Sequence, residues 1–144
     1  YHEVIPGVVV GGSIDLLRPT EIVDYKTTSQ LTAPEKVPRA YYFQQMCYVW
    51  LARKHGYNIQ SFRLVYITTN VTGRVSEKTG KPLKDYPTTV TSVVHQVTPE
   101  DLQMIDGVIS LIAESVKAFQ DNPKIRHLLA QDMRLKARVT FLNK

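Results

Sequence analysis

Apolar residues near the N-terminus recur at the short spacing that is typical of β-strands. Residues 2–10 form a candidate strand interrupted at Pro6-Gly7, residues 8–17 form a stronger one, and residues 21–27 form a third. The sequence Arg-Pro-Thr at residues 18–20 predicts a turn, because proline is favoured at the second position of a turn. The chain is therefore predicted to open with three strands.

A helix is predicted over residues 39–54. Pro38 suits the first turn of this helix, and Gly56 stands where a left-handed C-terminal cap is expected. Residues 61–69 and 88–97 have the composition of strands, rich in β-branched and aromatic side chains. The polar residues between these two strands predict an exposed loop or a flexible hairpin.

A long amphipathic helix is predicted to begin at Thr98-Pro99-Glu100-Asp101. This segment combines an N-cap threonine, a proline at the first helical position and acidic residues in the first turn. The helix is expected to end near Asn122-Pro123, and a second, basic helix is expected over residues 124–136. The apolar face of the long helix recurs at three- and four-residue spacing and comprises Leu102, Ile105, Ile109, Ile112, Val116 and Phe119.

The predicted order is three strands, a helix, two strands and a helix (βββ-α-ββ-α). This order indicates an α/β (α+β) sandwich with a mixed central β-sheet flanked by helices. At 144 residues, 43% of them hydrophobic, the chain suffices for one compact domain. We expect the core over residues 1–121 and a basic, helical segment over residues 122–144.

The net charge of +5 is concentrated in that C-terminal segment. Residues 122–144 carry six basic side chains and one acidic side chain, so the first 121 residues, with 12 of each sign, are neutral. Such a segment can bind phosphate backbones. A solvated terminal helix accounts for the same charge equally well.

The composition excludes several classes of protein. Cys47 is the single cysteine, which excludes a disulfide framework and any four-cysteine zinc or iron–sulfur site within this chain. No apolar run approaches the length that crosses a membrane, and the N-terminus lacks the pattern of a signal peptide. We therefore expect a cytoplasmic protein without an iron–sulfur cluster or membrane partner.

Charged residues are concentrated around the predicted turn at residues 18–20. A symmetric hairpin places Asp15 opposite Asp24, where Cβ atoms lie about 4.5–5.5 Å apart and like charges are destabilising. Lys26 lies two residues beyond Asp24 on the same face. The neighbouring positions are apolar, so we expect these charges to be partly desolvated and costly if unpaired.

Three changes would relieve the repulsion between Asp15 and Asp24. One carboxyl could take up a proton, Lys26 could neutralise the pair, or a divalent cation could bind between the carboxylates. Two carboxylates beside a backbone carbonyl form an oxygen site of the kind that Mg²⁺ accepts. A lysine next to the cation can hold a water molecule or stabilise an oxyanion on phosphorus. An ordinary Asp24–Lys26 salt bridge is the alternative interpretation.

Three short segments occur in a specific order: residues 12–15 (GSID), 22–27 (IVDYKT) and 44–48 (QQMCY). Together they resemble the PD-(D/E)XK nuclease superfamily, and most closely its RecB-like and phage-exonuclease branch. The resemblance implies a restriction-endonuclease-like core that hydrolyses phosphodiester bonds with Mg²⁺ or Mn²⁺. It also implies DNA as the partner, in phage or bacterial recombination or repair.

The resemblance assigns the central chemistry to residues of the hairpin. Asp15, Asp24 and Lys26 would form the catalytic set. Asp15 and Asp24 would also ligate the metal, together with the backbone carbonyl of Tyr25. In this assignment a bound water attacks phosphorus while the cation stabilises the added negative charge.

Three further residues would support the site or contact DNA. Gln44 and Tyr48 match the Q-x-x-x-Y motif of RecB-like enzymes, one helical turn apart on one face. Thr27 would contact phosphate. The alternative is that Gln44 and Tyr48 are ordinary residues of a helix face and that Thr27 satisfies hydrogen bonds at the end of a strand.

The sequence departs from the family pattern at its N-terminus. Family members usually have a helix before the first strand, often with a Glu or His in the site, whereas residues before Asp15 are predicted as strand. Glu3 is expected to lie on a strand rather than to replace that residue. The alternative to a nuclease is a catalytically inactive nucleic-acid-binding or interaction module with the same fold. A homo-oligomer or a recombination partner protein is compatible with either.

Overall fold

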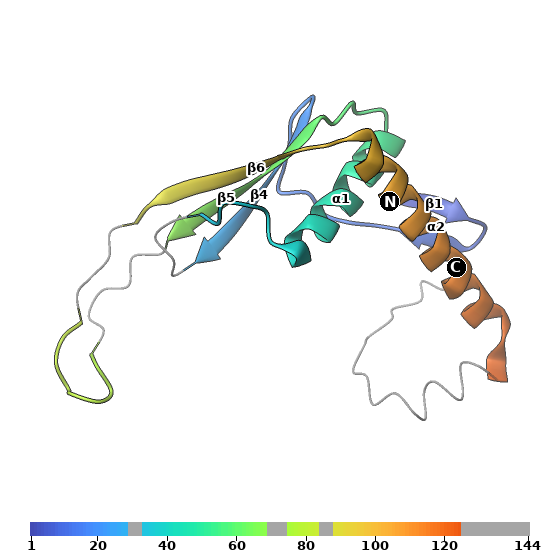
Figure 1. The fold of residues 1–144 in the computed structure, drawn as a ribbon. Coiled ribbons are helices and arrows are strands. Elements are labelled where there is room, and N and C mark those ends of the chain that lie inside the picture. Colours follow the sequence, from blue (N-terminus) through green and yellow to red (C-terminus); the bar gives the residue numbers. More distant parts are fainter. Residues whose placement is uncertain (29–32, 69–74, 84–87, 125–144) are drawn as a thin grey trace.

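The structure is a computed structural model that describes residues 1–28, 33–68, 75–83 and 88–124 of the chain. Six strands and two helices lie within these residues (Figure 1). In chain order they are β1 (His2–Ile5), β2 (Val8–Val10), β3 (Leu16–Leu17), β4 (Glu21–Thr28), α1 (Arg39–Lys54), β5 (Ser61–Thr68), β6 (Val90–Gln96) and α2 (Pro99–Asp121).

The strands form a four-stranded mixed sheet and a separate hairpin. The sheet order is β3-β4-β5-β6, in which β4 and β5 are parallel and the other neighbours are antiparallel. Helix α1 makes the crossover between the two parallel strands, as parallel pairing requires. Among the strands of the described residues, β1 and β2 pair only with each other. This arrangement confirms the predicted class, a mixed central sheet with flanking helices.

The prediction of one strand over residues 8–17 is wrong. Strand β2 ends at Val10, and only Leu16–Leu17 pairs with β4. Two glycines lie between them, and glycine weakens a strand. Aromatic rings occupy the space of their missing side chains. A Cβ on Gly11 would meet the ring of Tyr1, and a Cβ on Gly12 would lie 2.8 Å from Cε1 of Tyr48.

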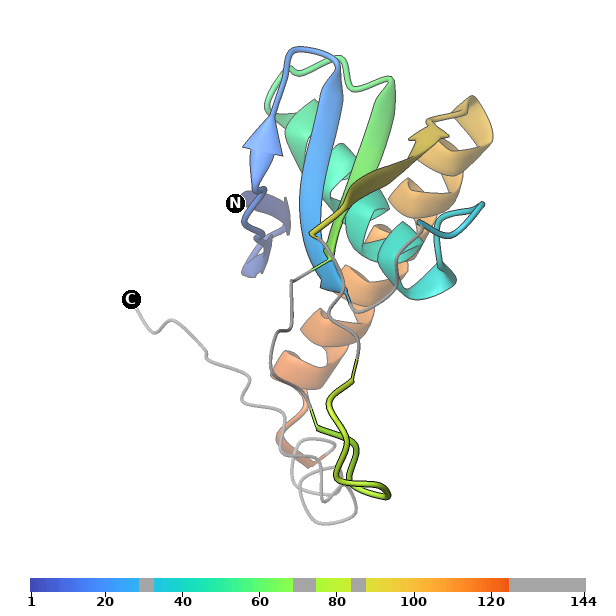
Figure 2. The same cartoon turned by 90° about the vertical axis from the view of Figure 1, so that its left-hand side faces the viewer.

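Helix α1 has the bounds that the sequence predicts, Arg39–Lys54. Gly56 follows it with a φ of +89°, the left-handed conformation that glycine adopts at helix ends, and its N–H bonds the carbonyl of Arg53. The helix buries Met46, Val49 and Trp50 with Ile22 and Phe62 of the sheet. Figure 2 shows α1 lying behind the sheet.

Helix α2 begins with the predicted cap. Thr98 accepts the N–H of Asp101, and the Asp101 carboxylate accepts the N–H of Thr98, which is a capping box. The helix packs against α1 and the β1–β2 hairpin, with Ile105, Ile109 and Ala113 buried.

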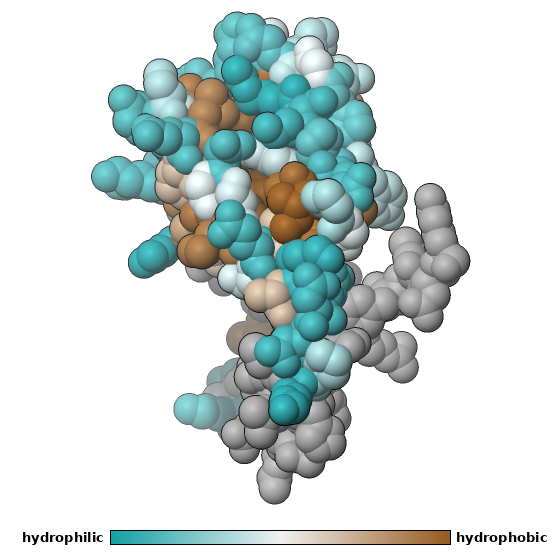
Figure 3. All heavy atoms as spheres, turned by 90° about the vertical axis from the view of Figure 1, so that its right-hand side faces the viewer, coloured by the Kyte–Doolittle hydropathy of each residue, from teal (hydrophilic) through white to brown (hydrophobic). Residues whose placement is uncertain are grey.

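The predicted apolar face of α2 is buried only in its first half. Further along, Ile112 and Val116 are exposed, as is Leu111. Figure 3 views the side on which α2 and the β1–β2 hairpin lie and shows apolar atoms between hydrophilic ones. None of the helices in the described ranges is long and apolar enough to cross a membrane.

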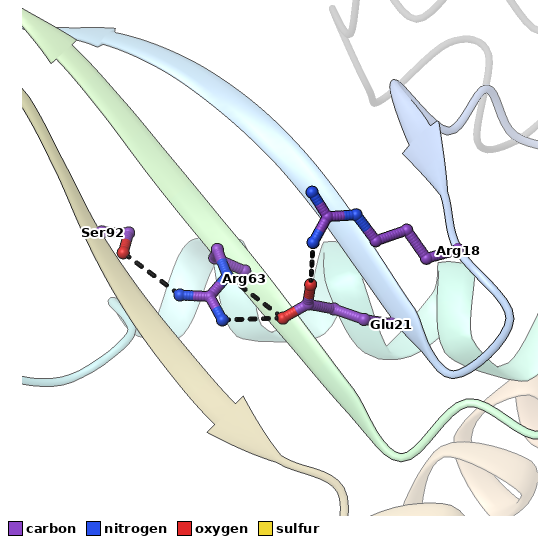
Figure 4. A network of polar contacts seen from close by, with 4 residues as sticks. All are labelled: Arg18, Glu21, Arg63 and Ser92. Carbon is purple, nitrogen blue, oxygen red and sulfur yellow. Dashed lines mark hydrogen bonds and ion pairs between the residues drawn. The ribbon is translucent and has the colours of Figure 1, made fainter.

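A polar network lies on the face of the sheet that points away from α1 and connects the turn before β4 to β5 and β6 (Figure 4). Glu21 pairs through one oxygen with Arg18 and through the other with Arg63, each at 3.0 Å. Arg63 also donates to the Ser92 hydroxyl on β6. The network therefore crosses β4, β5 and β6 at the start of β4.

Two predictions concern residues that lie largely outside the described ranges. The C-terminal helix over residues 124–136 is one, since the description ends at Lys124. Of the predicted loop between β5 and β6, residues 75–83 are described and form a short turn in which Val75 bridges Pro82.

The Asp101 carboxylate links α2 to α1 and β6 as well as capping its own helix. It accepts the hydroxyl of Tyr42 and Nε2 of His95, the latter at 2.7 Å. Partial burial would raise the pKa of Asp101, but the hydrogen bonds from Thr98, Tyr42 and His95 outweigh burial and lower this pKa to about 2.

We predict that acid removes the stabilisation due to Asp101. Its pKa is lower in the folded protein than its ordinary value of 3.8, so the stabilisation is complete above pH 4 and is lost as the pH falls toward 2. The size is on the order of 2 kcal/mol. Urea unfolding of wild type and Asp101→Asn between pH 7 and pH 2 measures it. The wild type should lose more stability than the variant across this window, and equal losses would contradict the prediction.

Candidate active site

The alternation of β4 places Asp24 and Lys26 on the face that α1 covers. Ile22, two residues earlier on the same face, is part of the core beneath the helix. Asp24 is 5% exposed, and Nζ of Lys26 lies 2.8 Å from its Oδ2. The two charges expected together therefore form a largely buried ion pair.

Helix α1 supplies the remaining contacts of Lys26. Its Nζ donates to Oε1 of Gln44 at 3.3 Å and lies 4.7 Å from the ring centroid of Tyr41. Nε2 of Gln44 in turn donates to the hydroxyl of Tyr48 at 3.2 Å. The i and i+4 positions of Gln44 and Tyr48 put both on one helix face. A continuous chain of polar contacts thus runs from Asp24 through Lys26 and Gln44 to Tyr48.

Asp15 lies at the edge of β4, one residue beyond the short pairing with β3. The symmetric register of the predicted hairpin is confirmed where β3 and β4 pair, since Leu16 faces Val23 and Leu17 faces Ile22. Beyond it, Oδ2 of Asp15 accepts the backbone N–H of Tyr25 at 3.0 Å. Asp15 is exposed, whereas Asp24 is buried.

The backbone of Tyr25 directs its carbonyl toward the same edge. In extended backbone the N–H and C=O of one residue point to the same side of the strand. Because the N–H of Tyr25 reaches Asp15, its carbonyl faces the edge that β3 leaves uncovered. Asp15 and the Tyr25 carbonyl thus meet beside the ion pair.

Thr27 is the predicted site residue that the structure does not bring to the ion pair. It alternates with Lys26 and so lies on the opposite face of β4, where it is exposed. Its position, on the other face of β4 from the Asp24–Lys26 pair, therefore does not support the predicted contact with phosphate.

Sequence reasoning missed Tyr66, which faces Lys26 across the β4–β5 ladder. Tyr66 is 7% exposed, and its hydroxyl has no hydrogen-bond partner among the described residues. Burial raises the pKa of its phenol, and Tyr41 and Asp24 raise that pKa further, so the hydroxyl keeps its proton at neutral pH. The alternation of β5 marks Tyr66 as inward-facing. Its nearness to Asp24 follows only from the parallel register.

The comparison with protein families decides the assignment. The family model of the PD-(D/E)XK nuclease superfamily matches residues 2–136. The chain belongs to the PD-(D/E)XK nuclease superfamily. Searches of curated proteins and of solved structures returned no match.

Membership of the PD-(D/E)XK superfamily implies a nuclease, and such nucleases typically use divalent metals. The oxygen donors at the edge of β4 fit such a cation. Oδ2 of Asp24 is buried and is held by the ammonium of Lys26 at 2.8 Å. With Asp15 and the Tyr25 carbonyl, the Asp24 carboxylate forms an all-oxygen set. No group of three His, Cys, Asp or Glu side chains among the described residues could hold a metal ion, so side chains alone do not form such a site there.

Gly12 connects two of the PD-(D/E)XK motifs through close packing. Its Cα faces the ring of Tyr48, which receives the hydrogen bond from Gln44. An added Cβ would lie 2.8 Å from Cε1 and 3.1 Å from Cδ1 of that ring. The glycine therefore lets the segment that carries Asp15 approach α1.

We predict that Gly12→Ala destabilises the protein by about 1–3 kcal/mol, because the ring of Tyr48 must move away from the added methyl group. Gly107→Ala on α2 is the matched control. Nothing lies within 4 Å of its Cβ position, so it should stabilise the helix by about 0.5–1 kcal/mol. Urea unfolding measures both, and a neutral Gly12→Ala would contradict the close packing.

Proposed function

We propose that the protein is a Mg²⁺- or Mn²⁺-dependent deoxyribonuclease that hydrolyses phosphodiester bonds. The observation that carries this proposal is the buried Asp24–Lys26 pair, held by Gln44 and next to the oxygen donors of Asp15 and Tyr25. Breaking up a buried ion pair is costly, yet apolar residues in its place are often as stable. A chemical role explains why both charges are present.

Each residue has a distinct role in this proposal. Asp15, Asp24 and the Tyr25 carbonyl would hold the cation, which supplies an activated water and stabilises negative charge on phosphorus. Lys26 brings its ammonium to that charge, and the pairing with Asp24 holds its Nζ in place. Gln44 accepts a hydrogen bond from Lys26, so it orients the ammonium without taking its charge.

The contact from Gln44 to Tyr48 supports an exonuclease-like activity of the RecB-like branch. The Tyr48 hydroxyl accepts from Gln44, which leaves its own proton available for donation to a phosphate oxygen. A role in phage or bacterial DNA recombination or repair goes with that branch. The basic C-terminal residues would add sequence-independent attraction to DNA.

We predict that the protein degrades linear double-stranded DNA with Mg²⁺ or Mn²⁺ and that EDTA stops it. Asp24→Asn and Lys26→Met should each lower the rate at least about 100-fold, because each removes a charge that stabilises the transition state. A gel or fluorescence assay of DNA length measures the rate. Lys54→Met is the matched control, since Lys54 lies on α1 but pairs with Asp106.

The variants of the buried pair need a check of folding, because a single charge left behind is destabilising. Circular dichroism and thermal unfolding provide it. Gln44→Ala gives a second test, since Gln44 is exposed and its loss should not affect folding. Full activity in folded Asp24→Asn and Lys26→Met would contradict the assigned roles. DNA binding without cleavage by the wild type would favour the inactive binding module.

A further inference from the structure

Tyr66 is a buried residue on the face of the sheet that carries the proposed chemistry. It pairs with Lys26 across the parallel ladder and lies in a small apolar cluster with Leu64 and Val93. Tyr41, whose ring lies beneath the ammonium of Lys26, packs against the same cluster. The phenol therefore borders the ion pair from the β5 side.

Two buried polar atoms lie on this face of the sheet. The Tyr66 hydroxyl, which can donate, has no hydrogen-bond partner among the described residues, whereas Oδ2 of Asp24, which can only accept, lies 2.8 Å from Nζ of Lys26. Asp24 pairs with Leu64, and Tyr66 is two residues further along β5 on the same face. Strand spacing and rise put the two Cα atoms about 8 Å apart, a separation that a long phenol and one water molecule can span.

We propose that Tyr66 is a positioning residue for Asp24, and that its hydroxyl and Oδ2 of Asp24 share one hydrogen-bonded water molecule. This inference rests on the proposed function, because it gives Asp24 a cation to bind. The shared water fixes the carboxylate against rotation, so that its other oxygen faces Asp15 and the Tyr25 carbonyl.

The chemistry of the two groups favours a shared water over other arrangements. Buried waters in proteins satisfy polar groups that have no other partner. A phenol that stays protonated can donate to a water, and the water can donate to a carboxylate. In metal sites, partners that hold a ligating carboxylate from behind commonly matter nearly as much as the ligand itself.

Tyr66→Phe tests this inference because it removes one oxygen and keeps the ring. We expect the affinity of the protein for Mn²⁺ to fall about 10–100-fold, as is typical when such a partner of a metal ligand is lost. Isothermal titration calorimetry without DNA measures this affinity. DNA cleavage at saturating Mn²⁺ should recover part of the rate lost at low Mn²⁺, since the defect lies in holding the metal ligand.

Tyr42→Phe is the matched control. Tyr42 also carries a partly buried hydroxyl, but that hydroxyl donates to Asp101 at the start of α2. Tyr42→Phe should lower the melting temperature and leave the Mn²⁺ affinity at the wild-type level. Tyr66→Phe should do the reverse, with a melting temperature near that of the wild type and a weaker affinity.

Two outcomes separate this inference from the proposed function. Wild-type affinity for Mn²⁺ in folded Tyr66→Phe would overturn the role of Tyr66, whatever the cleavage assay shows. A wild type that binds Mn²⁺ but leaves DNA intact would overturn the proposed function, and the comparison of affinities would still decide the role of Tyr66.

Discussion

The parallel pairing of β4 with β5 is the constraint on which the rest of the fold depends. Parallel strands need a long crossover, and α1 provides it by packing over the face that carries Ile22 and Phe62. The same face carries Asp24 and Lys26 further along β4. Any charge on this face must therefore be accommodated beneath a helix. Gln44 and Tyr41 of α1 both contact the ammonium of Lys26, so the crossover helix that stabilises the sheet also completes the site.

The buried ion pair is easier to explain by chemistry than by stability. Desolvation of two charges offsets most of their attraction, and surface ion pairs such as Lys117–Asp121 avoid that cost. In the other network of the sheet, the partners of Glu21 reach solvent, since the side chains of Arg18 and Arg63 are 55% and 35% exposed. Only beside the Asp15 edge do an acid and a lysine of the described residues enter the covered face together. The Glu21 network lies on the open face of the sheet, whereas the charges with a proposed chemical role lie on the face that α1 covers.

Much of the fold and of the site was predictable because local rules apply to them. The bounds of α1 follow from Pro38 and Gly56, and the capping box of α2 follows from Thr98 and Asp101. The motif residues Asp24, Lys26, Gln44 and Tyr48 are adjacent in space because alternation and helical spacing are local properties.

The features that escaped prediction depend on contacts between distant segments. Between β2 and β3, the rings of Tyr1 and Tyr48 pack onto two glycines, a contact between segments that are far apart in the sequence. Tyr66 lies beside the site because of the register between β4 and β5, and the sequence of β5 alone does not predict that register. Thr27 is one residue from Lys26 in sequence, yet the pleat sends it to the other face.

The contact between Asp15 and the backbone of Tyr25 has a consequence for the association of chains. Strand β3 pairs with only two residues of β4, so the far part of β4 presents an edge at which the strand of another molecule could add. The carboxylate occupies the N–H of Tyr25, and its negative charge disfavours an incoming backbone carbonyl. Asp15 thus disfavours the addition of another strand at this open edge. The same side chain would therefore oppose aggregation and bind the proposed cation.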